Sequence, residues 1–190
     1  MKEFEYKRLM TKETYEALCR WCKQLYQGSK NMQINYYYDT PDGTCHGSNI
    51  TVRVRQKGTE LKGTIKYHGI QNMPFVSNEQ HFKVHTLPMY MEFGGRWISF
   101  MGQMVTERIR FPVAEGVELM LDRNSYLGKV DYELELEFLP QEQYKAEAFL
   151  QWLEQQFVLQ MGGKHKSARF FDTLLKEKGR EVPCKCQYSA

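Results

Sequence analysis

The sequence predicts an α+β protein in which eight antiparallel strands close into a β-barrel, a tunnel with a charged lumen, and helices pack outside. Three observations support this fold class. Several segments alternate charged and apolar residues with a period of two, which places the charges on one face of a strand. The charges on most of these segments have a single sign. Three other segments have helical spacing with one apolar face each, so they can cover the apolar side of the sheet and leave its charged side in the lumen.

The N-terminal segment shows the alternation first. Glu3, Glu5 and Lys7 share one face of the expected strand, and Phe4 and Tyr6 share the other. Carboxylates about 7 Å apart on one strand repel each other unless a cation or hydrogen-bond donors lie between them. The pair is therefore a candidate for binding a hard metal ion. The alternative is the solvated outer face of an antiparallel sheet.

The next elements follow from capping and alternation. A helix is expected from the N-cap Thr11 to Gln27-Gly28, where glycine commonly ends a helix. Strands are then expected at 33–39, 50–56, 60–68 and about 79–84, with a turn at 40–43. The short connection at 57–58 makes two of these strands antiparallel neighbours. The stretch 69–95 carries the weakest pattern.

The second half repeats this organisation. Strands are expected at 97–100, 103–111, 117–122 and 130–138, with a hairpin loop at 124–128. Two helices should follow, at about 142–160 and 167–178, each with a broad apolar stripe. Gly162-Gly163 and Gly179 are expected to end them.

The signs of the charges are segregated between strands. Arg53 and Arg55, the lysines of 62–66, and Arg108 with Arg110 give strands with positive charge only, whereas 131–137 carries four acids on one face. A solvated sheet usually mixes both signs along each strand. Strands of one sign indicate faces that converge on a charged ligand, and a triphosphate with divalent cations requires both signs.

Length and composition are typical of one compact domain. The chain has 190 residues, 42% hydrophobic and 14% aromatic, and no stretch resembles a linker. We expect a single domain over 1–178 and a C-terminal tail over 179–190. A net charge of +3 is too small to indicate a nucleic-acid or membrane partner, and no apolar run resembles a signal peptide or a membrane span. The sequence therefore predicts a cytoplasmic protein and leaves its oligomeric state open.

Other reactive or aromatic residues have structural interpretations. Cys19 and Cys22 form a C-x-x-C with helical spacing, which favours a core position for Cys22 over zinc binding. Tyr37 and Tyr38 are expected to pack between barrel and helix rather than to stack on a base. The five histidines show no ligand spacing and are expected on the surface or in loops.

Taken in order, the motifs resemble the CYTH family of triphosphate tunnel metalloenzymes over residues 1 to about 175. They are Glu3-x-Glu5-x-Lys7, Tyr37-Tyr38-Asp39-Thr40-Pro41, Arg53-x-Arg55, Thr64-Ile65-Lys66, Leu121-Asp122 through Tyr126-Leu127-Gly128, Asp131-Tyr-Glu-Leu-Glu-Leu-Glu137 and Lys166-Ser167-x-Arg169-Phe170. The first motif alone arises often by chance, but the whole set in this order is specific. The resemblance implies an eight-stranded antiparallel barrel and substrates that bear a triphosphate.

The resemblance also implies roles for individual residues. One or two divalent ions, Mg²⁺ or Mn²⁺, would be held by Glu3, Glu5, Glu133 and Glu135, which together with Lys7 form the catalytic set. Phosphate oxygens would be bound by Lys7, Arg53, Arg55, Lys66, Arg108 and Lys166. Membership of the site stays open for Glu79, Arg110, Asp122, Glu137 and Arg169. These residue types suit the chemistry, because Mg²⁺ prefers oxygen ligands and guanidinium groups bind phosphate at two points.

Two classes of function follow. The first is a metal-dependent hydrolase of a small-molecule triphosphate: inorganic triphosphate first, with nucleoside or thiamine triphosphate as alternatives, or a related adenylate cyclase. The second is a binding module for polyphosphate or nucleotide. The two acidic strands favour the enzyme, because a binder of polyanions gains little from carboxylates in its lumen. Phosphoryl transfer depends mainly on positioning and charge neutralisation, so no nucleophilic side chain is required.

Overall fold

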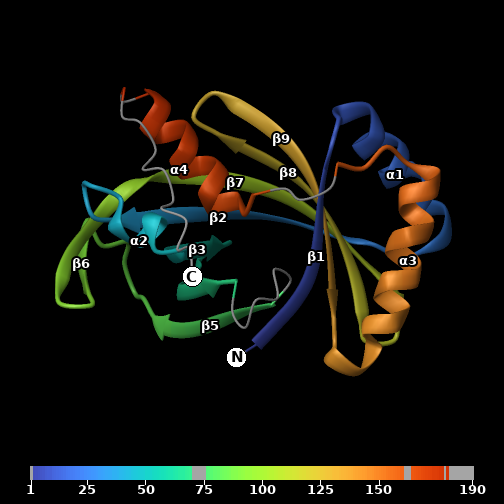
Figure 1. The fold of residues 1–190 in the computed structure, drawn as a ribbon, viewed down its shortest axis with the longest axis horizontal. Coiled ribbons are helices and arrows are strands. Elements are labelled where there is room, and N and C mark those ends of the chain that lie inside the picture. The colour runs from blue at the N-terminus through green and yellow to red at the C-terminus, as the bar shows by residue number, and fades with distance from the viewer. Residues whose placement is uncertain (1, 70–75, 161–163, 178, 180–190) are drawn as a thin grey trace, which may run out of the picture.

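The computed structural model describes residues 2–69, 76–160, 164–177 and 179. Nine strands and four α-helices make up this part of the chain (Figure 1). The strands are β1 (Lys2–Met10), β2 (Ser29–Asp39), β3 (Ile50–Lys57), β4 (Glu60–His68), β5 (Val76–Lys83), β6 (Tyr90–Phe93), β7 (Arg96–Ala114), β8 (Val117–Tyr126) and β9 (Lys129–Phe138). The helices are α1 (Lys12–Leu25), α2 (Thr44–Gly47), α3 (Gln143–Gln156) and α4 (Lys166–Glu177).

Eight of the strands form a closed antiparallel barrel. Neighbouring strands follow the order β2-β3-β4-β5-β1-β9-β8-β7, and pairing of β2 with β7 completes the circle. Strand β6 stands outside this circle and pairs with the first residues of β7. The predicted α+β fold with an eight-stranded barrel and helices outside is therefore confirmed.

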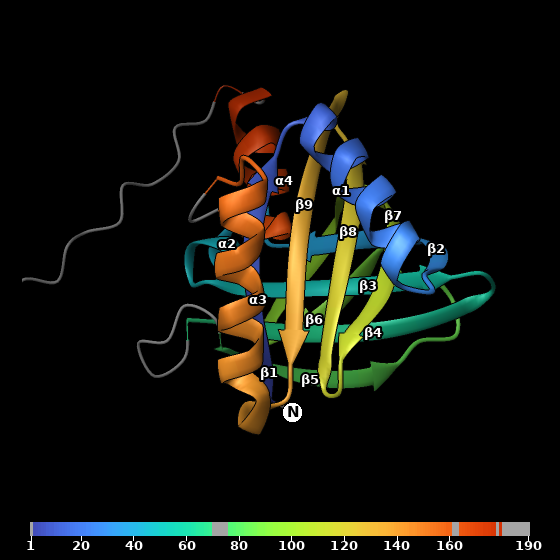
Figure 2. The ribbon, with the colours of Figure 1, turned by 90° about the vertical axis from the view of Figure 1, so that its right-hand side faces the viewer.

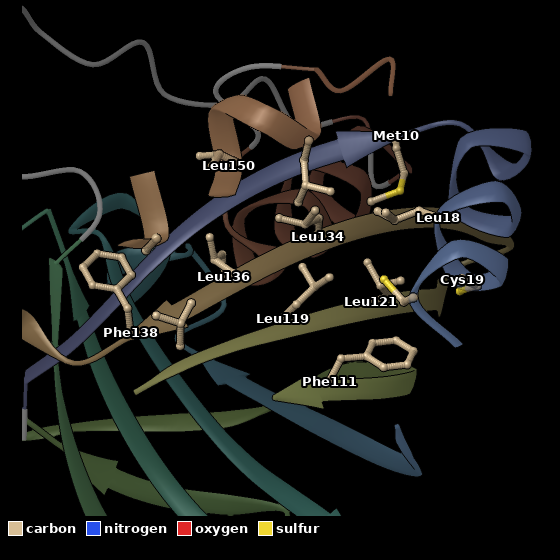
Figure 3. Close-up of a cluster of buried hydrophobic side chains, with 14 residues drawn as sticks. Met10, Leu18, Cys19, Phe111, Leu119, Leu121, Leu134, Leu136, Phe138 and Leu150 are labelled. Carbon is tan, nitrogen blue, oxygen red and sulfur yellow. The ribbon is translucent and has the colours of Figure 1, made fainter. Parts of the chain in front are cut away.

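Helices α1 and α3 cover the outer face of β1, β9 and β8 (Figure 2). The alternation of these strands explains the contact, because Leu134 and Leu136 of β9 point outward while Glu135 between them points into the barrel. They meet Leu18 of α1 and Leu153 of α3 in the largest buried cluster (Figure 3 shows part of it). Cys22 is fully buried in this cluster, as its spacing predicted.

Helix α4 packs across one end of the barrel. Phe170 is fully buried and lies 4.8 Å from Tyr37, measured between ring centroids, and both contact Met104 and Tyr126. Gly102 makes room for this ring, because a Cβ at that position would lie 2.7 Å from Phe170. Tyr37 thus packs between barrel and helix, as predicted.

Tyr38 packs elsewhere. It belongs to a separate cluster with Val52, Val54 and Ile98, and its hydroxyl donates to the carbonyl of Pro88 over 2.9 Å. Tyr38 was expected to pack against a helix. In its cluster the helical residue is Cys45, which belongs to the short helix α2.

Several predicted boundaries were wrong. The strands expected at 97–100 and 103–111 are one strand, β7, which continues through Gly102 at φ +143°. Strand β8 extends to Tyr126, so the hairpin turn is only Leu127-Gly128, both with positive φ. Strands β2 and β5 begin earlier than expected, α3 ends at Gln156, and β6 and α2 were not predicted.

Other boundaries agree with the sequence pattern. The Thr11 side chain accepts a hydrogen bond from the Thr14 backbone and caps α1, as expected. Gly162-Gly163 and the tail beyond Gly179 lie outside the described residues. Among the helices that the structure describes, none combines the length and apolar character that crossing a membrane requires.

Candidate active site in the barrel lumen

The lumen gathers the residues that the sequence singled out. Nine of the ten predicted site residues line a single cavity, and the tenth, Glu133, is fully buried beside it. The nine are Glu3, Glu5 and Lys7 of β1, Arg53 and Arg55 of β3, Lys66 of β4, Arg108 of β7, Glu135 of β9 and Lys166 of α4. Residues from six elements thus meet because strand alternation turns their polar faces inward.

The two carboxylates of β1 gather around Lys66. Its ammonium contacts Glu3, lies 2.9 Å from Glu5 Oε1 and lies 3.4 Å from Glu79 Oε1. Burial by itself would raise the pKa of Glu5, but Lys66 and Lys7 hold that pKa well below its usual range. The cation that the alternation of β1 required between its carboxylates is therefore supplied by β4, which is separated from β1 by β5 in the barrel.

A second acidic group lies around Lys166. The carboxylates of Asp122, Glu133 and Glu135 have oxygen atoms within 4.8 Å of one another, and all three residues are buried. The Lys166 ammonium lies 2.8 Å from Asp122, 2.6 Å from Glu133 and 2.6 Å from Glu135. Burial opposes the charge on Lys166, but these three acids raise its pKa. One ammonium thus occupies the centre of three carboxylates.

Lys7 joins the two acidic groups. Its ammonium lies 3.0 Å from Glu5 and 3.1 Å from Glu135. Burial would lower the pKa of Lys7, but Glu135 and Glu5 raise it well above its usual value. The four predicted metal ligands consequently belong to one network, in two groups of carboxylates bridged by lysines.

The arginines of the lumen differ in how fully their charge is compensated. Arg108 is 5% exposed, donates two hydrogen bonds to Asp122 over 2.8 and 2.6 Å, and also contacts Glu135. Arg53 reaches Glu79 only at 3.4 Å. Arg55 donates to the amide oxygen of Asn35 over 2.9 Å, and within the described chain it has no carboxylate at ion-pair distance. Burial, then Arg53 and Arg108, lower the pKa of Arg55 to about 9.

Three residues left open by the sequence contact this network. Asp122 completes the group around Lys166, and Glu79 lies between Lys66 and Arg53. Arg169 of α4 pairs with Asp131 over 2.8 Å and with Glu133 over 3.0 Å, so it anchors α4 to β9.

The other two open residues lie toward one end of the lumen. Arg110 is one-third exposed and lies 3.5 Å from Glu118. Glu137 pairs in register with Glu5 on one side and Glu118 on the other. Burial, followed by Glu3, Glu5 and Glu135, raises the pKa of Glu137 to about 7.

Two histidines line the lumen cavity, which the sequence did not indicate. The expectation of surface or loop positions holds for His81 and His85, which are exposed, and for His165, which lies in the loop before α4. It is wrong for the half-buried His46 of α2 and for His68 of β4. His68 and His165 both line the cavity, and their rings stack. Period-two alternation with Lys66 was the signal available for His68. The contact between His68 and His165 left no local signal, because the two residues lie far apart in the sequence.

The sequence matches a known family. A family model described as the CYTH domain matches residues 1–171. The curated relative YjbK of Bacillus subtilis (strain 168), whose name proposes a triphosphatase, is 26% identical over 182 residues, covering 90% of this chain and 94% of the relative.

Solved structures have the same fold. A Bacillus halodurans protein described as a proposed adenylate cyclase has a TM-score of 0.71 and 25% identity, covering 90% of this chain and 98% of its own. The Hippeastrum protein HpAC1 has a TM-score of 0.66 and 18% identity, covering 96% of this chain and 97% of its own. It is described as a proposed adenylyl cyclase that reveals a dominant triphosphatase activity.

Proposed function

Because this chain belongs to the CYTH family, we propose that it is a divalent-metal-dependent hydrolase of substrates that carry a triphosphate, with inorganic triphosphate first. The observation that carries the proposal is the incompletely compensated positive charge of Arg55 on β3. Arg55 has an amide rather than a carboxylate as its partner, and it lies beside Arg53 and Arg108. A partly buried guanidinium without an acid is unfavourable in the free protein and favours a bound anion.

The remaining cations extend this anion site across the lumen. Lys7, Lys66 and Lys166 reach the same cavity from three different elements. Each of these lysines neutralises carboxylates in the free protein. Each could bind phosphate oxygens once another cation neutralises those carboxylates instead. Arginine forks hold phosphate at two points and lysines add compact charge, so the two kinds of cation together suit a chain of phosphate groups.

The acidic groups fit a hard divalent ion. Asp122, Glu133 and Glu135 offer only oxygen donors, close together and buried, which are the ligands that Mg²⁺ and Mn²⁺ prefer. The ammonium at their centre shows that the protein already places a cation there. Glu3 and Glu5 form a second oxygen group around Lys66. A metal bound to either group would neutralise charge on the phosphate oxygens during transfer.

The protein's own residues would position and neutralise the substrate rather than attack it. Arg53 and Arg55 would hold the phosphate chain along β3, and Lys66 would compensate charge from the adjacent strand β4. The names of YjbK and HpAC1 agree with triphosphatase activity. A second candidate is adenylate cyclase activity, which the description of the Bacillus halodurans protein favours.

The test is to incubate the purified protein with inorganic, nucleoside and thiamine triphosphates, with Mg²⁺ or Mn²⁺, and to identify products by phosphorus NMR. We expect phosphate release that stops in excess EDTA. Glu135→Gln should abolish it, whereas Glu16→Gln, on an exposed side chain of α1, serves as the matched control. Release that continues in EDTA would refute the metal dependence, and cyclic AMP as the main product from ATP would favour the cyclase.

A further inference from the structure

The two lumen histidines join β4 to the residue that precedes α4. The ring centroids of His68 and His165 lie 3.9 Å apart at an interplanar angle of 26°. His68 Nε2 lies 2.8 Å from the Thr51 hydroxyl, which lies 2.6 Å from the Ser167 hydroxyl. Thr51 and Ser167 are both buried, so one nitrogen of His68 is engaged by a hydroxyl pair that joins β3 to α4.

The other side of each ring lacks a partner. Nδ1 of His68 and Nδ1 of His165 are buried and have no hydrogen-bond partner among the described residues. Buried polar atoms are nearly always paired, and an ordered water commonly supplies the bond where protein does not. Both rings line the same cavity as Lys7, Lys66 and Lys166. The stack therefore marks a place for water beside the cations that would hold phosphate.

The position of the stack gives the substrate a direction. Helix α4 packs across this end of the barrel, with Phe170 against Tyr37 of the cavity lining. At the other ends of β3 and β4, Arg55 pairs in register with the exposed Lys62, and Lys57 is exposed as well. Cations without a carboxylate at ion-pair distance among the described residues thus continue away from α4.

Building on the proposed function, we propose that the stacked rings of His68 and His165 hold the water that attacks the terminal phosphorus atom of the triphosphate. The remainder of the substrate then extends away from α4 along Arg53 and Arg55. The water oxygen forms a bond to the terminal phosphorus atom, and the bond to the bridging oxygen breaks with its electron pair on that oxygen. One water proton stays on the new phosphate hydroxyl and the other ends on the leaving oxygen.

The charges around the rings favour positioning over proton removal. Burial, then His165, Lys66 and Lys7, lower the pKa of His68 to about 2, against the opposing charge of Glu5. Burial, then Lys7 and Lys66, lower the pKa of His165 to about 4, against Glu5 and Glu133. Neutral rings accept a hydrogen bond from water, and a lone pair on Nδ1 suits a cavity lined by ammonium groups better than an N–H does. They are positioning residues that act through water.

The test replaces each ring with one that stacks but has no nitrogen. His68→Phe and His165→Phe should each lower kcat by roughly tenfold to a hundredfold. Affinity for tripolyphosphate, measured by calorimetry with Ca²⁺ if Ca²⁺ does not support turnover, should stay within about twofold in both variants. The metal-free melting temperature should not fall in His165→Phe, whereas His68→Phe also removes the hydrogen bond to Thr51. His85→Phe, at an exposed position, is the matched control and should leave kcat unchanged.

The outcomes separate the two proposals. A kcat within about twofold of the parent in both variants would overturn the water-holding role, although the triphosphatase would stand. Parallel losses of kcat, affinity and melting temperature would also overturn it, because they would show a structural contact. A parent protein that hydrolyses no triphosphate would instead refute the proposed function, and the attacking role with it.

Discussion

Replacing Arg55 should weaken substrate binding without weakening the fold. Among the described residues the guanidinium donates to Asn35, and Arg53 and Arg108 near it outweigh the acids Glu135 and Glu79, so in the free protein its charge is incompletely compensated. A pKa of about 9 in place of the usual 12.5 corresponds to about 5 kcal/mol of unfavourable interaction at face value. Arg55 is partly exposed, and solvent in the tunnel reduces this to roughly 1–2 kcal/mol. Arg55→Met should therefore leave the free energy of unfolding unchanged or raise it by up to about 2 kcal/mol.

The same substitution at Arg108 should have the opposite effect on stability. Arg108 pairs with Asp122 and Glu135, all three being almost fully buried, so Arg108→Met leaves two acids with less compensation. Breaking a buried ion pair by removing one partner costs roughly 3–5 kcal/mol. Both variants lose one phosphate contact, and each should bind tripolyphosphate about tenfold to more than a hundredfold more weakly, for roughly 1.5–3 kcal/mol.

Urea unfolding in EDTA and calorimetry with tripolyphosphate measure the two quantities separately. Lys176→Gln is the control for net charge, because this exposed lysine of α4 should change affinity by less than about twofold at physiological salt. A loss of more than about 1 kcal/mol in the unfolding free energy of Arg55→Met would show that its charge is compensated in the free protein. An affinity equal to that of the control would remove Arg55 from the phosphate site.

Two further predictions concern the pH dependence and the packing of the barrel. The raised pKa of Glu137, about 7, means that its contribution to stability is fully present below about 4.5 and is lost as the pH rises to about 7. Glu137→Gln should remove this loss. At pH 8 its free energy of unfolding, measured in urea with EDTA, should exceed that of the parent by roughly 1–2 kcal/mol once solvent screening is included. An unchanged free energy of unfolding would contradict the raised pKa. Gly102→Ala should lower the free energy of unfolding by roughly 1–3 kcal/mol, because a Cβ at φ +143° would lie 2.7 Å from Phe170. Gly47→Ala has open space around it and should cost under about 0.5 kcal/mol. Equal costs for the two variants would contradict the contact with Phe170.

The barrel was predictable because local alternation records which face of a strand is buried against helices. Leu134 and Leu136 lie outward and the acids beside them inward, as the period of two requires. Segregated signs then indicated a polar lumen. Prediction failed where the backbone conformation of one residue sets the end of a strand. At Gly102 a left-handed φ lets β7 continue, and at Leu127 a positive φ shortens the hairpin turn.

The ion pairs of the lumen were not predictable from the strands one at a time. The alternation of β1 and β9 indicates crowded carboxylates, but Lys66 and Lys166, which neutralise them, come from β4 and α4. Only closure of the barrel and docking of α4 bring these charges together. Cytoplasmic location and the absence of a nucleic-acid or membrane partner stay predictions.

The neutralised lumen bears on how metal and substrate would bind together. Three carboxylates share the ammonium of Lys166, so a metal that took their oxygens would release that ammonium. The released ammonium would then be available to phosphate, and phosphate bound to it would keep it from competing with the metal for the carboxylates. Each ligand would therefore improve the site for the other, which would be a positive coupling with no change in the barrel. Arg55, which has no acid at ion-pair distance among the described residues, would need no such exchange, and so the first contact of an incoming triphosphate with the tunnel would fall to β3.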